Sequence, residues 1–356
     1  MWPYWVMFAI PAFAALAIEK KSVKMHRVRL DNEWMSAIIV LTLLIGYRFE
    51  VGGDWGNYLP MLDTVMGERF TDVLLMGDPG YQVINWLSAE MRWGIFGVNL
   101  MGGAIFSTGL VVFCLSLPRP WLALAVSVPY LVIVLGMGYS RQGIALGLAM
   151  LGMVALERGK TYWFVFSGLL GTTVHKSAVL LLPIPALAVN RNRYWTAAWV
   201  GLIAVLAYKV LLEESTEHLY KNYVEAEYQS SGALVRLSMN VLPSVILLVW
   251  RKKFSFVGTE RKLWQWFAYI SIALFGMLMV SPSSTAVDRV ALYMLPLQLV
   301  VFSHFPEVFG NPLKRNEALV AAVLLYYTAV EFVWLNFADN AGSWIPYRFY
   351  PLEAWF

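Results

Sequence analysis

Basic side chains recur at the beginnings of apolar segments in this chain. Five such positions are Arg92, Arg141, His175-Lys176, Arg236 and Arg289. A helix N-terminus is the positive end of the helix dipole, so a cation there is mildly unfavourable by itself. A bound anion would remove that conflict, because helix N-termini and guanidinium groups both favour phosphate oxygens. The pattern predicts a phosphate or pyrophosphate site, whereas for any single residue the alternative is a snorkelling or ion-paired side chain.

The composition indicates a membrane protein. Of the 356 residues, 59% are hydrophobic and only 14% are charged, against about 25% charged in soluble domains. This excludes a cytosolic enzyme, a nucleic-acid-binding protein and a disordered scaffold, although the isoelectric point is near 9.0. One cysteine, Cys114, excludes disulfides within the chain, and the four scattered histidines have no zinc-ligand spacing.

About twelve apolar segments are candidate membrane spans, which need roughly 17–25 residues each. They lie near 2–18, 35–47, 98–117, 121–138, 141–156, 161–174, 177–189, 195–212, 233–250, 263–281, 289–305 and 317–336. No repeat, low-complexity tract or soluble region interrupts them. We expect an all-α polytopic protein of about 12 transmembrane helices, forming one integral-membrane domain over residues 1–356.

The charges of the connecting segments predict the orientation. Alternate connections carry 17 of the 27 Lys and Arg residues but only 7 of the 23 Asp and Glu residues. Since Lys and Arg concentrate on the cytoplasmic side, both termini should be extracytoplasmic. The two long connections, about 48–97 and 213–232, would then be outer loops, and the basic segment starts would face outward.

The first outer loop contains two acidic turns. Asp54 follows two glycines and suits a turn cap, and Asp78 precedes a proline and suits a helix N-cap. Apolar residues then recur at helical spacing, at Ile84, Leu87 and Met91. This predicts an amphipathic helix on the outer membrane surface.

Two glycines after Arg141-Gln142 predict close helix packing. Gly143 and Gly147 are spaced so that neighbouring helices can approach closely, which would hold Arg141 and Gln142 rigidly at the outer end.

The remaining acidic and aromatic segments carry weaker signals. Glu225 and Glu227 could contact a divalent cation, although a solvated loop is the simpler reading. The aromatic tail at 344–351 suggests an interfacial anchor.

A set of short motifs resembles the EpsG group of Wzy-type polysaccharide polymerases. In order they are Arg48…Gly53-Asp54…Tyr58, Asp78-Pro79-Gly80-Tyr81, Ser140-Arg141-Gln142, His175-Lys176-Ser177 and Asp288-Arg289…Tyr293. The resemblance spans about 48–296. This chain departs from the usual family pattern at Trp55, Asp78, Lys176 and Met294.

The resemblance implies a GT-C-type membrane glycosyltransferase of the bacterial plasma (inner) membrane. Such enzymes join lipid-linked repeat units at the outer face. Donor and acceptor would both be polyprenyl-pyrophosphate-linked oligosaccharides, the donor carried on undecaprenyl pyrophosphate. Chain-length regulators and export proteins are further partners that such a polymerase could have.

On this hypothesis the candidate residues divide into two chemical roles. Cations would stabilise the departing pyrophosphate: Arg141, Arg289 and Lys176 first, then Arg48 and Arg236. A general base would activate the acceptor hydroxyl; Asp54 is the first candidate and His175 the second, while Asp78 would position or cap.

Other side chains would contact sugar rings or line the lipid path: Trp55, Tyr58, Tyr81, Gln142 and Tyr293. A purely interfacial role is the alternative for the aromatic residues. No metal and no cofactor are expected, since arginines can neutralise pyrophosphate.

Two other classes of protein stay open. Another integral-membrane transferase would add a single sugar or an acyl group, although the predicted outward position of His175 argues against coenzyme A as donor. A lipid-linked glycan flippase or transporter would need a polar path through the membrane and often a repeat, and the sequence shows neither.

Overall fold

The computed structural model describes residues 1–17, 30–189, 193–211, 230, 232–281, 283–311 and 314–353. Within these ranges the chain is helical and holds no strand, only an isolated antiparallel bridge between Arg48 and Phe349. The all-helical fold predicted from the sequence is therefore confirmed for the described residues. Glu225, Glu227, Arg191 and most of the loops 18–29 and 213–232 lie outside them.

The described part of the chain forms a succession of helices. They are α1 (Trp2–Ala17), α2 (Asn32–Gly46), α3 (Trp55–Val65), α4 (Phe70–Val73), α5 (Pro79–Glu90), α6 (Gly94–Leu115), α7 (Pro120–Ser127), η1 (Val128–Gly136), α8 (Ser140–Glu157), α9 (Thr161–Val174), η2 (Lys176–Leu181), α10 (Ile184–Ala188), α11 (Arg193–Leu211), α13 (Ala233–Val249), α14 (Gly258–Val280), α15 (Ser284–Ala291), η5 (Leu292–Met294), α16 (Pro296–Phe309), α17 (Glu317–Phe337), η6 (Ala341–Ser343) and α18 (Tyr350–Glu353).

Each of the twelve predicted apolar segments coincides, where it is described, with one helix or with two or three consecutive helices. Among the described residues, α6, α14 and α17 are long and apolar enough to cross a membrane singly. The pair formed by α15–η5 and α16, bent by 44°, would make a fourth span. The others are shorter or less apolar, so the number twelve stays a prediction.

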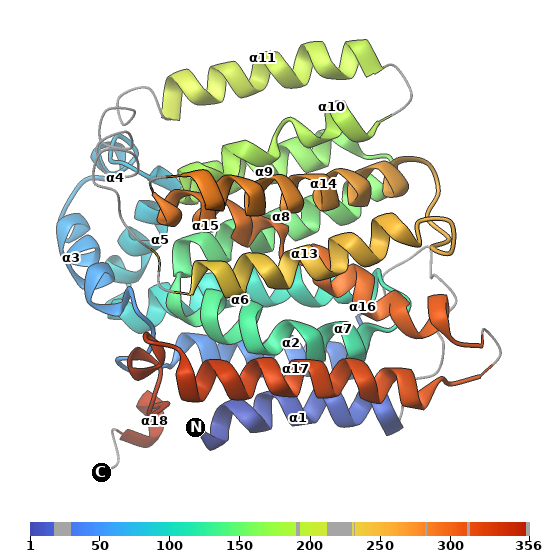
Figure 1. The fold of residues 1–356 in the computed structure, drawn as a ribbon. Helices are drawn as coiled ribbons and strands as arrows, with labels where there is room; N and C mark the ends of the chain where they lie inside the picture. The colour runs from blue at the N-terminus through green and yellow to red at the C-terminus, as the bar shows by residue number, and fades with distance from the viewer. Residues whose placement is uncertain are drawn as a thin grey trace.

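The long helices lie side by side, roughly parallel or antiparallel to one another, so that the bundle has two ends (Figure 1). At one end, on the left in Figure 1, lie the start of α1 and the helices α3, α4, α5 and α18. We call this the site end. Here α2 ends, α8 begins, α9 ends and α15 begins.

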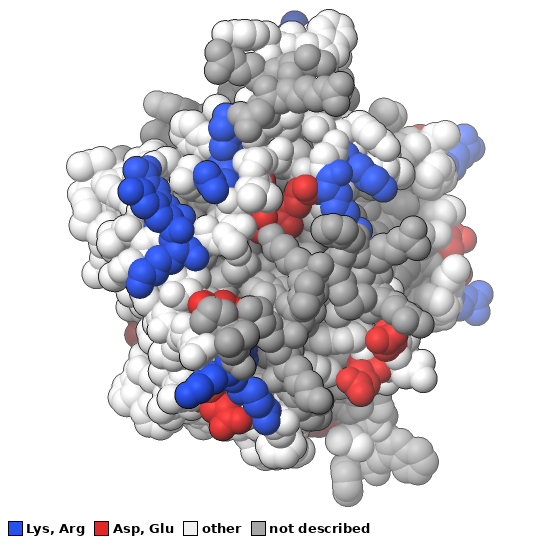
Figure 2. Space-filling view, turned by 90° about the vertical axis from the view of Figure 1, so that its right-hand side faces the viewer, with Lys and Arg blue, Asp and Glu red and all other residues white. Residues whose placement is uncertain are grey.

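Those predicted basic connections that the structure describes lie at the opposite end. Figure 2 shows that Lys and Arg side chains gather in groups on this face. They belong to the turns after α8, α13 and α16, where Arg158, Lys160, Arg251, Lys253 and Lys314 are all exposed. The charge pattern of the sequence thus corresponds to two distinct ends of the molecule.

Glycines bring α6 and α8 into close contact, as predicted for Gly147. A Cβ atom at Gly147 would stand 2.7 Å from the Cα of Phe106, and one at Gly109 would overlap the backbone of Gly147. Gly143 instead faces η1, at ordinary contact distance from the Leu135 carbonyl oxygen. Close backbone contact fixes the start of α8, where Arg141 lies.

The surface helix predicted after Asp78 exists as α5, with Pro79 as its first residue. Its buried face, however, comprises Tyr81, Ile84, Asn85 and Ser88, whereas Met91 is exposed. The predicted arrangement of its faces is wrong because α5 packs on α3, α6 and α9. The buried Ser88 hydroxyl has a partner within the protein, because it donates a hydrogen bond to the Gly94 carbonyl oxygen.

Candidate functional site

An ion pair between Arg141 and Asp78 lies at the centre of the site end. Arg141 Nη1 donates to Asp78 Oδ2 at 2.7 Å, joining the start of α8 to the start of α5. Asp78 occupies the N-cap position of α5 with a left-handed φ of 55°, but its side chain makes no cap hydrogen bond. The carboxylate is therefore available to Arg141.

Burial and nearby cations act on Asp78 in opposite directions. Burial raises the pKa of this carboxyl above its usual value, while the charges of Arg141 and Lys176 lower it and do not fully cancel the effect. Asp78 Oδ1 is buried and has no hydrogen-bond partner in the described chain. Asp78 thus has a partner for one carboxylate oxygen and unused acceptor capacity on the other.

Two buried tyrosines support Arg141. The guanidinium carbon lies 5.9 Å from the centre of the Tyr81 ring, and the rings of Tyr81 and Tyr58 are 5.7 Å apart. Burial, reinforced by Asp54, raises the pKa of Tyr58 to about 12, so its hydroxyl stays protonated. That hydroxyl lies 3.5 Å from Asp54 Oδ2, which links the aspartate of the first turn to Arg141 through a short chain of contacts.

His175 lies between α9 and η2, and Lys176 is the first residue of η2. Burial, together with the positive charges of Arg141 and Arg289, lowers the pKa of His175 to about 3. The imidazole is consequently neutral at pH 7. Lys176 Nζ lies 4.0 Å from where a Cβ on Gly77 would stand, and its charge acts on Asp78.

Arg289 closes the other side of this cluster. Its guanidinium carbon lies 4.4 Å from the centre of the Tyr139 ring, a cation–π contact. Gln142 Nε2 donates to the Arg289 carbonyl oxygen at 2.6 Å, fixing α15 to α8. No ion pair within the described ranges involves Arg289, so its charge is held by an aromatic ring.

Tyr293 of η5 and Ser177 of η2 join these two short helices. Their hydroxyl oxygens are 3.1 Å apart, and Tyr293 is buried. Five predicted residues, Arg141, Asp78, His175, Lys176 and Arg289, thus lie around one location, which we call the cationic cluster.

Arg48 lies beneath the cluster. It is 1% exposed and donates to the carbonyl oxygens of Ile45 and Val51 and to the side chains of Asn99 and Ser140. Trp55, 9% exposed, lies under the same guanidinium at 5.7 Å. This geometry suits bracing the turn before α3 and the start of α8 better than direct contact with a ligand.

Arg236 is paired with Asp288, a partnership that sequence reasoning did not identify. Nε donates to Oδ1 at 2.7 Å and Nη2 to Oδ2 at 2.6 Å, so that α13 is clamped to α15. The spacing of the two residues in sequence gives no signal for this contact. Tyr139, the ring under Arg289, was also missed, although it lies two residues before Arg141.

The arrangement suits an anion with several oxygens. Two guanidinium groups and an ammonium group meet at the N-terminal end of α8, where the helix dipole adds positive potential. Asp78 and the tyrosines hold these groups in place before a ligand arrives, which lowers the cost of organising them.

The described chain is an all-helical protein with apolar helices long enough to cross a membrane and a cationic cluster at one end. The chain matches the EpsG family over residues 33–349 and belongs to it. EpsG proteins are a Wzy-like polysaccharide polymerase family. No curated protein and no solved structure matches this chain.

Proposed function

We propose that this protein is a membrane glycosyltransferase that polymerises undecaprenyl-pyrophosphate-linked repeat units at the outer face of the bacterial plasma membrane. The cationic cluster at the site end is the observation that carries the proposal. Family membership supports the polymerase chemistry, and the separation of the basic loops from the site end supports an outward-facing site.

In the proposed reaction a hydroxyl oxygen of the acceptor sugar attacks the anomeric carbon of the donor. The bond between that carbon and the pyrophosphate oxygen breaks, and undecaprenyl pyrophosphate leaves with the bonding electrons. Arg141, Arg289 and Lys176 stabilise the charge that develops on the leaving oxygen. The proton of the acceptor hydroxyl passes to a general base.

Asp54 is the better candidate for that base. His175 is neutral but has a pKa of about 3, since burial and two arginines disfavour its protonated form. Asp78 is engaged with Arg141 and suits positioning. Asp54 is half-buried, and its only described side-chain hydrogen bonds, from Asn57 and Tyr58, are long, at 3.5 Å.

The test is polymerisation by purified protein in lipid bilayers supplied with undecaprenyl-pyrophosphate-linked repeat units. Wild-type protein should produce a ladder of longer glycans, and Asp54→Asn should lower the rate by about 100-fold or more, the range for loss of a general base. Asp63→Asn, an exposed position on the same helix α3, is the matched control and should behave like wild type.

Addition of only one sugar by the wild-type protein would contradict polymerisation and favour a single-sugar transferase. Equal activity of Asp54→Asn and Asp63→Asn would remove Asp54 from the mechanism.

A further inference from the structure

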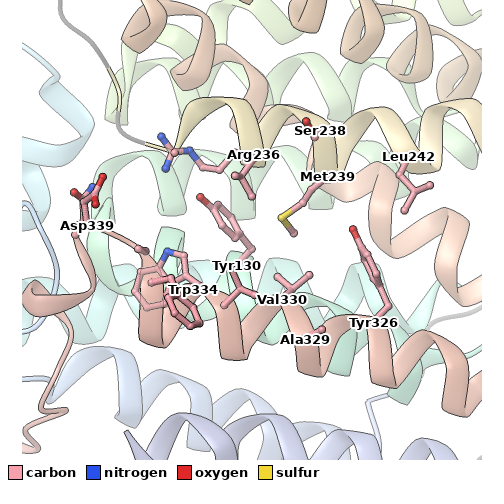
Figure 3. A pocket seen from close by; sticks show the side chains of 16 residues that line it. Tyr130, Arg236, Ser238, Met239, Leu242, Tyr326, Ala329, Val330, Trp334 and Asp339 are labelled. Carbon is pink, nitrogen blue, oxygen red and sulfur yellow. The ribbon is translucent and has the colours of Figure 1, made fainter.

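An apolar groove runs between α13 and α17, away from the cationic cluster. Its volume is about 460 Å³, and Figure 3 shows the side chains that line it. Met239 and Leu242 come from α13, and Val330 and Trp334 from α17. Val235 and Phe337, which also line it, are 57% and 71% exposed, as expected where a wall opens toward lipid.

The charged side chains that line the groove, Arg236 and Asp339, lie at one end of it, and the hydroxyl-bearing residues Ser238 and Tyr326 lie farther along (Figure 3). The end with these two charges, which we call the polar end, lies toward the site end, whereas Leu242 lies farther along. This distribution is complementary to an amphiphile whose headgroup lies at the site end and whose hydrocarbon chain extends along α13 and α17.

Arg236 is held rigidly at that polar end. Its bidentate pair with Asp288 uses Nε and Nη2, and Nη1 lies outside the pair, 3.4 Å from where a Cβ on Gly232 would stand. The polar end of the groove is therefore joined through Asp288 to α15, the helix that also carries Arg289 of the cationic cluster.

The acidic and amide groups at the polar end favour a sugar-bearing headgroup. Asp339 and Asn340 both line it, and a carboxylate and an amide oxygen accept hydrogen bonds from sugar hydroxyls. A bare anionic headgroup would meet repulsion from Asp339, whereas a phosphate joined to a sugar can place its charge near Arg236 and its hydroxyls near Asp339.

A second large groove lacks these features. It has a volume of about 700 Å³ and is lined by α1, α2, α7, η1 and the C-terminal segment, and its only charged lining side chains are those of Glu33 and Glu353. No Arg, Lys or His side chain lines it to meet a phosphate. This α1–α2 groove provides an internal comparison of similar apolar character.

From these contrasts we propose that the α13–α17 groove binds the hydrocarbon chain of a polyisoprenyl-pyrophosphate-linked sugar, with Arg236 beside the phosphate and Asp339 beside the sugar. The inference rests on the proposed function for the identity of the lipid. It adds the location of the chain and a role for Arg236 distinct from that of Arg141.

Photolabelling tests the location without requiring turnover. The probe is undecaprenyl pyrophosphate with a diazirine in its chain, added to purified protein in lipid nanodiscs, and the labelled peptides are identified by mass spectrometry. We expect labels on α13 and α17 that excess unlabelled undecaprenyl pyrophosphate removes and excess phosphatidylglycerol does not. Labels on α1 and α2, or labels that the phospholipid removes equally well, would overturn the proposal.

Two matched substitutions test the contribution of the groove to substrate use. Ala329→Trp fills the α13–α17 groove and Ala37→Trp fills the α1–α2 groove. In Ala329→Trp the new ring should displace about two methylene groups of the lipid chain from the groove, which should raise KM for the undecaprenyl-linked donor roughly tenfold. KM for a short-chain farnesyl-linked donor should stay unchanged. Ala37→Trp should change neither value, and equal effects of the two substitutions would contradict the proposal.

The two experiments separate the groove from the polymerase chemistry. Competed labelling of α13 and α17 by a protein that never polymerises would overturn the proposed function and leave the groove standing. Polymerisation by a protein that is labelled elsewhere would overturn the groove and leave the proposed function standing.

Discussion

At the scale of single residues, three arginines of the site end have three different kinds of partner. Arg141 has a carboxylate, Arg289 an aromatic ring and Arg48 a set of neutral oxygens. A partly buried charge needs such partners because burial without them is costly. The positions of the cations could be predicted from their places at segment starts. Their partners could not, since Asp78 lies 63 residues from Arg141 in sequence.

The environment of His175 leads to a prediction about pH. Its pKa is about 3 because burial and two positive neighbours disfavour the imidazolium. A pyrophosphate bound in the cationic cluster would offset the positive charges and favour the imidazolium, so the His175 pKa should rise. NMR titration of histidine-labelled protein with inorganic pyrophosphate should show this rise, and a pKa that stays constant or falls would argue against anion binding there.

At the scale of elements, the C-terminal segment contacts the two turns that precede α3 and α8, and thereby fixes the positions of Asp54 and Arg141. The amide of Gly52 donates to the Ser343 carbonyl oxygen at 2.8 Å, and the Trp344 ring lies against Gly53 and Gly138. Trp344 is 1% exposed, and its Nε1 donates to the Ile133 carbonyl oxygen at 2.8 Å. The expectation of an interfacial anchor is wrong for Trp344, because aromatic composition alone cannot distinguish an interfacial ring from one buried between distant loops.

This contact predicts that Gly138 cannot gain a side chain without disturbing the site. A Cβ at Gly138 would overlap the Trp344 ring, whereas one at Gly56 would meet nothing within 4 Å. Gly138→Ala should lower the free energy of unfolding by about 1–3 kcal/mol, the usual cost of overpacking. This loss should appear as a lower midpoint of thermal unfolding in detergent, and polymer synthesis should fall with it. Gly56→Ala should change neither.

A second substitution distinguishes this clash from a general effect of Ala at position 138. Trp344→Phe makes the ring smaller, so that Gly138→Ala combined with it should recover part of the lost stability. Purely additive losses in the double variant would count against the contact.

At the scale of the whole molecule, hydropathy and charge were enough to predict most of the architecture. All twelve apolar segments are helical where the structure describes them, and the described basic connections lie at the end opposite the cationic cluster. The bends could not be predicted, because the break between α15–η5 and α16 and the division of 177–189 into η2 and α10 depend on packing. Gly143 and Gly147 also face different neighbours, which their shared spacing does not reveal.

The orientation can be tested with single cysteines, since the native Cys114 is fully buried and can be replaced by alanine. Thr71→Cys lies on α4 at the site end, and Lys160→Cys lies at the opposite end, both exposed. A membrane-impermeant maleimide should label Thr71→Cys in intact spheroplasts and Lys160→Cys only after permeabilisation. The reverse pattern would place the cationic cluster in the cytoplasm.

The two ends of helix α8 allow the most direct test of the central claim. Arg141 begins the helix in the cationic cluster, and Arg158 follows its last residue at the opposite end. The measurement is the length distribution of glycans made by purified Arg141→Gln and Arg158→Gln proteins in lipid, from undecaprenyl-pyrophosphate-linked repeat units. We predict that Arg141→Gln leaves the repeat units almost unextended, because the negative charge that develops on the departing pyrophosphate loses a cationic hydrogen-bond donor. Arg158→Gln should give the wild-type ladder. A normal ladder from Arg141→Gln, or equal loss in both variants, would contradict the assignment of the site end as the place of sugar transfer.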